Sequence, residues 1–274
     1  MLVAWTLVVA FAGAPAVDSI CPQVAPAKDT WARTANRARA VLLIHGFHYH
    51  FTDAGVARAA LRPWQVKDSP LVKELGKDAD VFSLAYGQNV PLDVIVKESK
   101  LASSVAELKK LGYSEIVLIG HSAGGLIARQ FVEDNPSAGV AKVLQICSPN
   151  AGSALAELGG TKSQKPFLRS LTPDFRKKLL EARKDKRIPE KVQFLCVVAR
   201  TGKGADSDSI VLCESQWTPD LHKQGIPAVG VFGVHREVVR DAKLAVTLAG
   251  LVRDSHPRWS AERVEQGKKE ILAK

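Results

Sequence analysis

The sequence is poor in cysteine, and its cysteines form no metal-binding pattern. Only 4 of the 274 residues are cysteines, and none have the spacing of zinc ligands, which argues against a cysteine-based zinc site. Cys147 and Cys196 fall in apolar strand-like runs and are expected to be buried. Cys21 and Cys213 lie in less regular sequence and are open to pairing, although four cysteines allow several connectivities.

The start of the chain lacks an apolar run long enough to cross a membrane. Residues 2–17 carry no charged side chain, but a glycine and a proline interrupt the run. Ala14-Pro15-Ala16 fits the small-residue pattern of a cleavage site, while the basic residues that usually come before such a stretch are missing. The sequence predicts a signal peptide at residues 1–16, cleaved after Ala16, and hence a secreted or periplasmic protein. The alternative is an uncleaved apolar segment packed on the domain.

The chain has fewer acidic than basic residues. It contains 28 Asp and Glu and 38 Lys and Arg, for a formal net charge of +10. Residues 162–191 hold 11 basic and 4 acidic side chains, so most of the excess lies in one segment. No nucleic-acid-binding motif and no basic stripe interleaved with aromatics accompanies this charge. Nucleic acid is therefore not an expected partner.

The remaining pattern is that of one sizeable globular domain without internal repeats. Strand-like runs alternate with helical patterns, which predicts an α/β fold with a mostly parallel sheet of about six strands and helices on both faces. Strands are expected at residues 41–45, 81–86, 116–119, 142–147, 192–199 and 228–234. Helices are expected at residues 55–75, 94–111, 122–134, 175–184 and 237–252. The domain is expected to span residues 17–252, with no hairpin in residues 17–40, followed by a charged helical tail at residues 253–274.

The most informative motif is Gly120-His121-Ser122-Ala123-Gly124, which joins an expected strand to an expected helix. In that context Gly-x-Ser-x-Gly is a nucleophile elbow, a sharp turn that exposes the serine hydroxyl. Side chains two residues before and after the serine would collide with the turn, and glycine avoids this. The positive end of the following helix points toward a developing oxyanion. The motif predicts Ser122 as a nucleophile, the alternative being an ordinary glycine-rich turn.

Three segments together resemble lipase- and esterase-like α/β-hydrolases. Residues 112–129 resemble their elbow, and residues 41–47 resemble the strand that ends in His-Gly before the oxyanion loop. Residues 148–153 resemble the Thr-Pro-His-x-Gly-Ser segment of many of these lipases, with Asn150 in place of the histidine. The resemblance covers about residues 40–250 and implies the α/β-hydrolase fold. It also implies that the backbone amides of Phe47 and Ala123 form the oxyanion hole.

A nucleophilic serine needs a base, and the base needs an orienting acid. In elbow hydrolases the acid and then the histidine follow the serine along the chain. Asp208-Ser209-Ile210-Val211 matches the family pattern Asp-x-(Val/Ile)-Val, which favours Asp208. Asp206 and Glu214 are the alternatives, and turn capping is the structural interpretation of the aspartates.

Position along the chain favours His235 as the base, because it follows the last expected strand and precedes a helix. His222 comes before that strand and His256 lies beyond the last core element, so both fit less well. His45 and His121 are expected to have structural roles.

The sequence therefore predicts a serine carboxylic-ester hydrolase of the lipase/esterase type with the triad Ser122, Asp208 and His235. Its expected substrate is an ester or lipid, and no cofactor or metal is expected. A thioesterase or amidase with the same triad is the nearest alternative. A non-catalytic protein that binds a hydrophobic ligand is a more distant one.

A basic insertion at about residues 154–190 separates the fourth and fifth expected strands. Phe175, Leu179 and Leu180 fall on one face of its expected helix, with basic residues largely on the other. In the family this segment commonly contributes a lid or the rim of the substrate site. The insertion is either an amphipathic helix packed on the core or a cap that contacts an anionic membrane surface.

Overall fold

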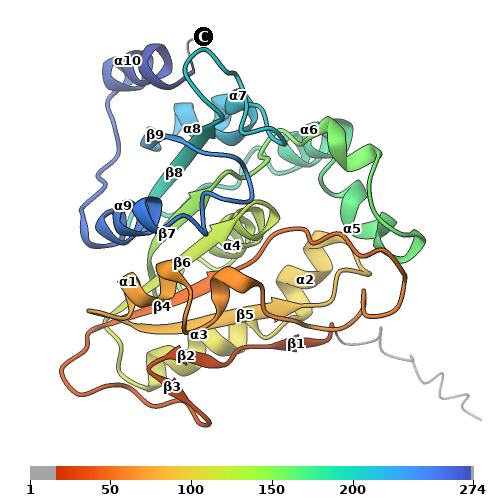
Figure 1. The fold of residues 1–274 in the computed structure, drawn as a ribbon. Coiled ribbons are helices and arrows are strands. Elements are labelled where there is room, and N and C mark those ends of the chain that lie inside the picture. Colours follow the sequence, from red (N-terminus) through yellow and green to blue (C-terminus); the bar gives the residue numbers. More distant parts are fainter. Residues whose placement is uncertain (1–16, 273–274) are drawn as a thin grey trace, which may run out of the picture.

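The computed structural model describes residues 17–272, so the expected signal peptide at residues 1–16 lies outside the described residues. Its centre is a nine-stranded sheet with the order β3-β2-β5-β4-β6-β7-β8-β9, and β1 pairs with β5 (Figure 1). The strands are β1 (Ser19–Ile20), β2 (Gln23–Ala25), β3 (Ala27–Lys28), β4 (Arg39–Ile44), β5 (Asp80–Tyr86), β6 (Glu115–His121), β7 (Val140–Ile146), β8 (Gln193–Arg200) and β9 (Ala228–Phe232).

The six long strands β4 to β9 run parallel and correspond to the six expected ones. The mainly apolar sequences of β4 to β8 follow from burial on both faces of the sheet, whereas β9 lies at its edge and is partly exposed. In β4, Leu42 and Ile44 enter one core cluster while Val41 and Leu43 enter the other, on the opposite face. The expected α/β class with a mostly parallel sheet is therefore confirmed.

The expectation of no hairpin in residues 17–40 is wrong. β2 and β3 form an antiparallel hairpin, and β1 and β2 both pair antiparallel with β5, which extends the sheet beyond six strands. These strands are two or three residues long, too short to show the alternating pattern by which a strand is recognised.

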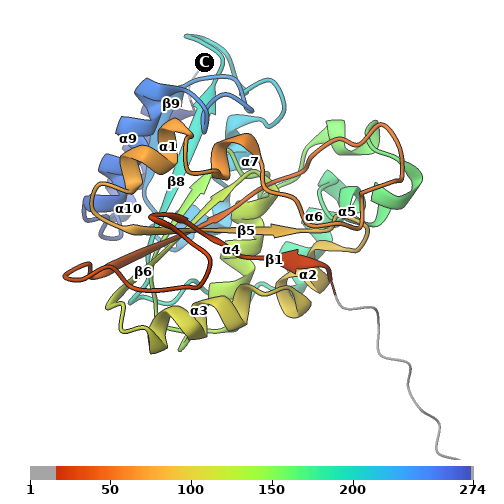
Figure 2. The ribbon, with the colours of Figure 1, turned by 60° about the horizontal axis from the view of Figure 1, so that its bottom comes forward.

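Helices cover both faces of the sheet (Figures 1 and 2). On one face α1 packs against α9; on the other α2 packs against α3 and α4. The helices are α1 (Pro70–Leu75), α2 (Leu92–Glu98), α3 (Leu101–Lys110), α4 (Ala123–Asp134), α5 (Lys165–Arg169), α6 (Pro173–Ala182), α7 (Cys213–Gln216), α8 (Pro219–Lys223), α9 (Ala242–Arg253) and α10 (Ala261–Ile271). Short 3-10 turns lie at Pro63–Gln65, Ala154–Glu157 and Lys162–Gln164.

Several helix boundaries differ from those expected. The helix expected at residues 55–75 is reduced to a 3-10 turn and α1, and the one expected at residues 94–111 is interrupted between α2 and α3. The last core helix starts later than expected, where the Asp241 side chain caps the amides of Lys243 and Leu244. The tail contains α10, whose buried residues Val264 and Ile271 join the main core.

The four cysteines are free and buried, so the pairing of Cys21 with Cys213 left open by the sequence does not occur. Cys196 lies within β8 and Cys147 directly follows β7. Within residues 17–272, no helix is both long and apolar enough to cross a membrane.

Candidate active site

Ser122 occupies a strained turn between β6 and α4. Its backbone has φ 56° and ψ −127°, a conformation that side-chain-bearing residues rarely adopt. The Ser122 amide donates to the Ile146 carbonyl at 2.8 Å, and its carbonyl accepts from the Gly125 amide at 3.0 Å. The turn is thus fixed both to β7 and to the first turn of α4.

The glycines of the motif are required by close backbone approaches. A Cβ atom on Gly120 would lie 2.4 Å from the Gly124 oxygen, and one on Gly124 would lie 2.1 Å from the Ile44 oxygen. A Cβ on Gly46 would lie 2.5 Å from the Ser122 Cβ. The loop after β4 therefore passes directly against Ser122, with the Phe47 peptide next in the chain.

The structure brings His235 and Asp208 together. The His235 Nδ1 lies 2.7 Å from Asp208 Oδ2, and the His235 amide donates to the Asp208 carbonyl at 2.8 Å. Asp208 Oδ1 accepts from the amides of Ile210 and Val211 at 2.9 and 2.7 Å. This carboxylate is completely buried, and each of its oxygens faces a donor.

The alternative acids and bases lie elsewhere. Asp206 and Glu214 are exposed, in contrast to Asp208. His256 bonds through Nε2 to the Leu251 carbonyl at 2.7 Å, and His222 packs against the Trp217 ring. Of these candidates, only His235 lines a cavity together with Ser122.

That cavity has a volume of about 230 Å³. Phe47 lines it on the side of the oxyanion loop, Leu168 and Leu171 come from the basic insertion, and Ile210 and Val211 from the loop that carries Asp208. Its lining is predominantly apolar around Ser122 and His235, which suits an apolar group next to the serine.

Buried side chains fix the loop after β4, which carries the candidate oxyanion-hole residue Phe47. Burial and the charge of Arg62 lower the pKa of His45 to about 3, so its ring is neutral. The Tyr86 amide donates to His45 Nε2 at 3.3 Å, which leaves Nδ1 to donate to the Gly46 carbonyl at 2.8 Å. The Tyr86 hydroxyl donates to the His45 carbonyl, and the two rings stack 4.2 Å apart. The structural role expected for His45 is thus given specific partners.

Gln88 holds the same loop on both sides of Phe47. Its Nε2 donates to the Gly46 carbonyl at 2.9 Å, and its Oε1 accepts from the His48 amide at 3.0 Å. Among residues 17–272 the amides of Phe47 and Ala123 have no hydrogen-bond acceptor. Ala123 is the first residue of α4, where an amide has no partner within the helix.

His121 supports the loop of the candidate base. Its Nε2 donates to the His235 carbonyl at 2.8 Å, and the two rings lie 4.8 Å apart. Burial, reinforced by the neighbouring His235, lowers the pKa of His121 to about 3. The neutral ring thus links the serine turn to the histidine loop, a wider role than the expected support of the turn alone.

Two residues that hold the acid could not be identified as such from sequence. The Gln216 side chain accepts from the Ala199 amide at 2.8 Å and donates to the Ala199 and Val211 carbonyls at 2.9 and 3.0 Å. Its Nε2 also lies 3.4 Å from Asp208 Oδ2. Asn150 in turn donates to the Gln216 carbonyl at 2.9 Å. Asn150 stood out only as a departure from the family segment, and Gln216 is part of no motif.

The basic insertion packs on α4 and partly uses its charge there. Arg183 pairs with Glu133 and Asp134, and Lys186 also pairs with Asp134. Arg176 is buried and donates to the Asn150 carbonyl at 3.0 Å, so the expected separation of basic and apolar faces is incomplete.

The insertion also reaches the loop that follows β4. Gln164 donates to the His48 carbonyl at 2.7 Å, and the Ser163 amide donates to Asp53 at 3.0 Å. Phe51 and Leu158, from the two connected segments, are 91% and 81% exposed. Large apolar side chains thus face solvent on segments that border the cavity.

One group in the described chain combines potential metal ligands: His121, Cys147 and His235, with ligand atoms within 4.8 Å of one another. Burial and the nearby Asp208 raise the pKa of the Cys147 thiol well above its ordinary value, which disfavours the thiolate needed by a metal. One nitrogen of each imidazole is already bonded, to the His235 carbonyl and to Asp208. These residues fit packing around the site better than metal coordination.

Solved structures share this architecture. No family model and no curated protein matches the sequence. The mature lipase BlEst2 of Bacillus licheniformis superposes with a TM-score of 0.61 at 14% identity, over 85% of this chain and 97% of that one. The metagenomic carboxyl esterase MGS0156 gives 0.59 at 15% identity, over 80% of this chain and 76% of that one. Phospholipase PlaB of Legionella pneumophila gives 0.58 at 14% identity, over 85% of this chain and 62% of that one. The chain has the α/β-hydrolase fold that these structures share.

Proposed function

We propose that the protein is a serine carboxylic-ester hydrolase of the lipase/esterase type. The observation that carries the proposal is one cavity lined by both Ser122 and His235, with His235 hydrogen-bonded to the buried Asp208. An orienting acid, a histidine and a serine on an elbow are the parts needed to activate a hydroxyl.

In the proposed reaction, Ser122 Oγ attacks the ester carbonyl carbon while His235 takes the hydroxyl proton. Because Nδ1 of His235 is bonded to Asp208, Nε2 is the nitrogen left to accept that proton. The carbonyl oxygen becomes an oxyanion that receives hydrogen bonds from the Phe47 and Ala123 amides. The intermediate collapses, the C–O bond breaks, and His235 protonates the departing alcohol. Water then attacks the acyl-enzyme in the same way and releases the acid.

An ester with an apolar group fits the surroundings of the serine. Phe47, Leu168 and Leu171 line the cavity, and Phe51 and Leu158 are exposed on the bordering segments. The matched structures named as a lipase, a carboxyl esterase and a phospholipase support the same class of reaction. Thioesters and amides are the nearest alternative substrates, because the same residues can attack any of these carbonyls.

The test is hydrolysis of a panel of p-nitrophenyl esters of increasing acyl length, beside thioester and amide analogues. We expect ester turnover and labelling of Ser122 by a fluorophosphonate probe. Ser122→Ala should lose both while keeping the melting temperature of the native protein. Full hydrolysis by folded Ser122→Ala would refute the mechanism, and faster turnover of the thioester or amide would reassign the substrate.

A further inference from the structure

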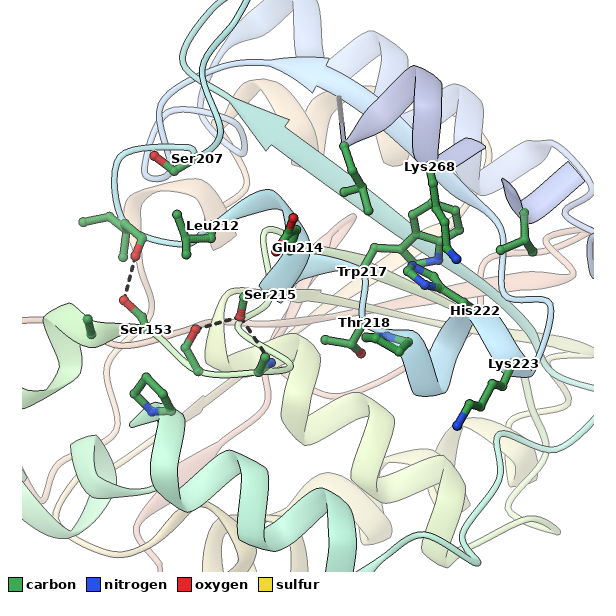
Figure 3. A pocket seen from close by; sticks show the side chains of 18 of the residues that line it. Ser153, Ser207, Leu212, Glu214, Ser215, Trp217, Thr218, His222, Lys223 and Lys268 are labelled. Carbon is green, nitrogen blue, oxygen red and sulfur yellow. Dashed lines mark hydrogen bonds between the residues drawn. The ribbon is translucent and has the colours of Figure 1, made fainter. Parts of the chain in front are cut away.

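A second and much larger cavity lies beside the catalytic one. Its volume is about 1040 Å³, just above the roughly 300–1,000 Å³ that is typical of sites for organic ligands. Residues 151–155, the segment around α7 and α8, and helix α10 surround it (Figure 3). We call it the α10 chamber.

The α10 chamber adjoins the catalytic cavity. Ser153, Leu155 and Ile210 line both spaces. The Ser153 hydroxyl donates to the Ile210 carbonyl at 2.6 Å, which fixes the shared wall (Figure 3). The two spaces meet at these three residues, so a substrate chain that runs from Ser122 into the larger space has to pass over them.

The walls of the α10 chamber suit a hydrocarbon chain. Trp217, Leu212 and Val264 contribute apolar surface. Two buried polar side chains in its wall already have partners: the Ser215 hydroxyl donates to the Gly152 carbonyl, and the Trp217 indole to the Ile226 carbonyl. Such a surface gains by contact with apolar groups and offers few free groups to a polar ligand.

Four charged side chains line the α10 chamber, and three of them, Glu214, Lys223 and Glu265, are exposed. Lys268 pairs with Glu265 at 2.6 Å. His222 packs 4.2 Å from the Trp217 ring, and burial lowers its pKa, which keeps the imidazole neutral. Its Nε2 is a buried atom without a hydrogen-bond partner among the described residues. The wall of the α10 chamber is thus mainly apolar, with the neutral His222 imidazole and charged side chains mostly at exposed positions.

The position of the shared wall indicates which part of an ester enters. Ile210 belongs to the loop of Asp208, which holds His235, and His235 protonates the departing alcohol oxygen. Neither Phe47 nor His235 lines the α10 chamber, but the sheet order separates them. Phe47 follows β4 on one side of β6, whereas Ser153, Ile210 and His235 follow β7, β8 and β9 on the other. The chamber is therefore reached from the side of the acid and base, where the alcohol portion leaves.

We propose that the α10 chamber binds the hydrocarbon chain of the alcohol portion of the substrate, so that the enzyme prefers esters of long-chain alcohols. This inference rests on the proposed ester hydrolase function. Burial of each methylene group can raise kcat/KM by up to about fourfold while the chain still gains contact with the walls.

The experiment compares two series of esters: acetates of alcohols from ethanol to dodecanol, and ethyl esters of acids from acetic to dodecanoic. We expect kcat/KM to rise more steeply along the alcohol series. Ala261→Trp should fill part of the α10 chamber from the exposed start of α10 and reduce the dodecyl-to-ethyl acetate ratio at least tenfold. Turnover of ethyl acetate should stay unchanged. Leu212→Asp, at a residue 57% exposed, should lower the same ratio by adding a charge to the wall.

Ala242→Trp is the matched control, because Ala242 is also the exposed first residue of a capped helix but does not line the α10 chamber. It should behave like the unchanged protein. A second measurement avoids turnover: Ser122→Ala should bind dodecanol in calorimetry, and the added Ala261→Trp should weaken that binding.

The outcomes separate this inference from the function on which it rests. Absence of ester hydrolysis, or hydrolysis that persists in Ser122→Ala, would overturn both. Serine-dependent hydrolysis that follows acyl length alone, or an alcohol-length preference unchanged in Ala261→Trp, would overturn the α10 chamber proposal only.

Discussion

Replacement of Asp208 by asparagine should stabilise the tautomer of His235 that cannot act as a base. Oδ1 of Asp208 accepts from two backbone amides, those of Ile210 and Val211. An asparagine must place its carbonyl oxygen there, because its NH₂ group would oppose two donors. The NH₂ group then faces His235 Nδ1, which has to accept. The histidine proton moves to Nε2, and no lone pair remains to activate Ser122.

The expected loss in kcat is about 10³–10⁴-fold, as for removal of the orienting acid in serine hydrolases. This corresponds to about 4–5.5 kcal/mol of transition-state stabilisation. KM should change little, because the acid touches the histidine and not the substrate.

The assay is steady-state hydrolysis of a short p-nitrophenyl ester, with the rate of fluorophosphonate labelling as a second readout. Asp206→Asn is the matched control, since Asp206 is exposed two residues away on the same loop, and its turnover should stay within a few-fold of the unchanged protein. If folded Asp208→Asn keeps a tenth or more of kcat, or if Asp206→Asn loses as much, the assignment of the acid is wrong.

Three further predictions concern the groups around the site. Gln216→Leu removes the hydrogen-bond partners of three buried backbone groups and should lower the free energy of unfolding by at least about 3 kcal/mol. Urea unfolding measures this loss, with Gln266→Leu at an exposed position as the control. Equal stability of the two variants would contradict the prediction. Burial holds the pKa values of His45 and His121 near 3, below the usual 6.5, so the unfolded chain binds more protons between these values. Stability should be fully present above pH 6.5 and fall on acidification toward pH 3, by up to about 1.4 kcal/mol per pH unit for each histidine, and His45→Gln should show a shallower slope. If the basic insertion contacts membranes, binding to lipid vesicles should rise with the content of anionic lipid and fall with salt. Replacement of the exposed Lys177, Lys178 and Lys184 by Gln should weaken this binding without slowing hydrolysis of a short ester. Binding that does not depend on lipid charge would leave the insertion with a structural role alone.

The parts of the fold that sequence predicts well are those with strong local requirements. The elbow needs glycine on both sides of Ser122, because a Cβ atom at Gly120 or Gly124 would lie less than 2.5 Å from a backbone oxygen. Five of the six parallel strands, β4 to β8, are mainly apolar because they are buried on both faces, and that composition is visible without knowledge of their neighbours.

Other parts depend on contacts between distant segments and could not be predicted. β2 and β3 pair with each other, and β2 also pairs with β5, far along the chain; their two or three residues carry no periodicity. Nothing in the sequence distinguishes Gln216, because its role depends on the Ala199 peptide that the fold places beside it. The tail was expected to be charged and helical, but only the structure shows Val264 in the wall of a cavity.

The candidate catalytic residues and the helix that lines the larger cavity lie in separate parts of the chain, which affects how this protein could be altered. Ser122, Asp208 and His235 all lie in connections after parallel strands, whereas α10 is a separate helix placed after the last of them. The helix lines a cavity that contains none of these three residues. Replacing α10 by helices with other inward side chains would therefore reshape that cavity and keep the candidate catalytic residues intact. A library confined to eleven helical residues could serve as a search for new selectivities on an unchanged reaction centre.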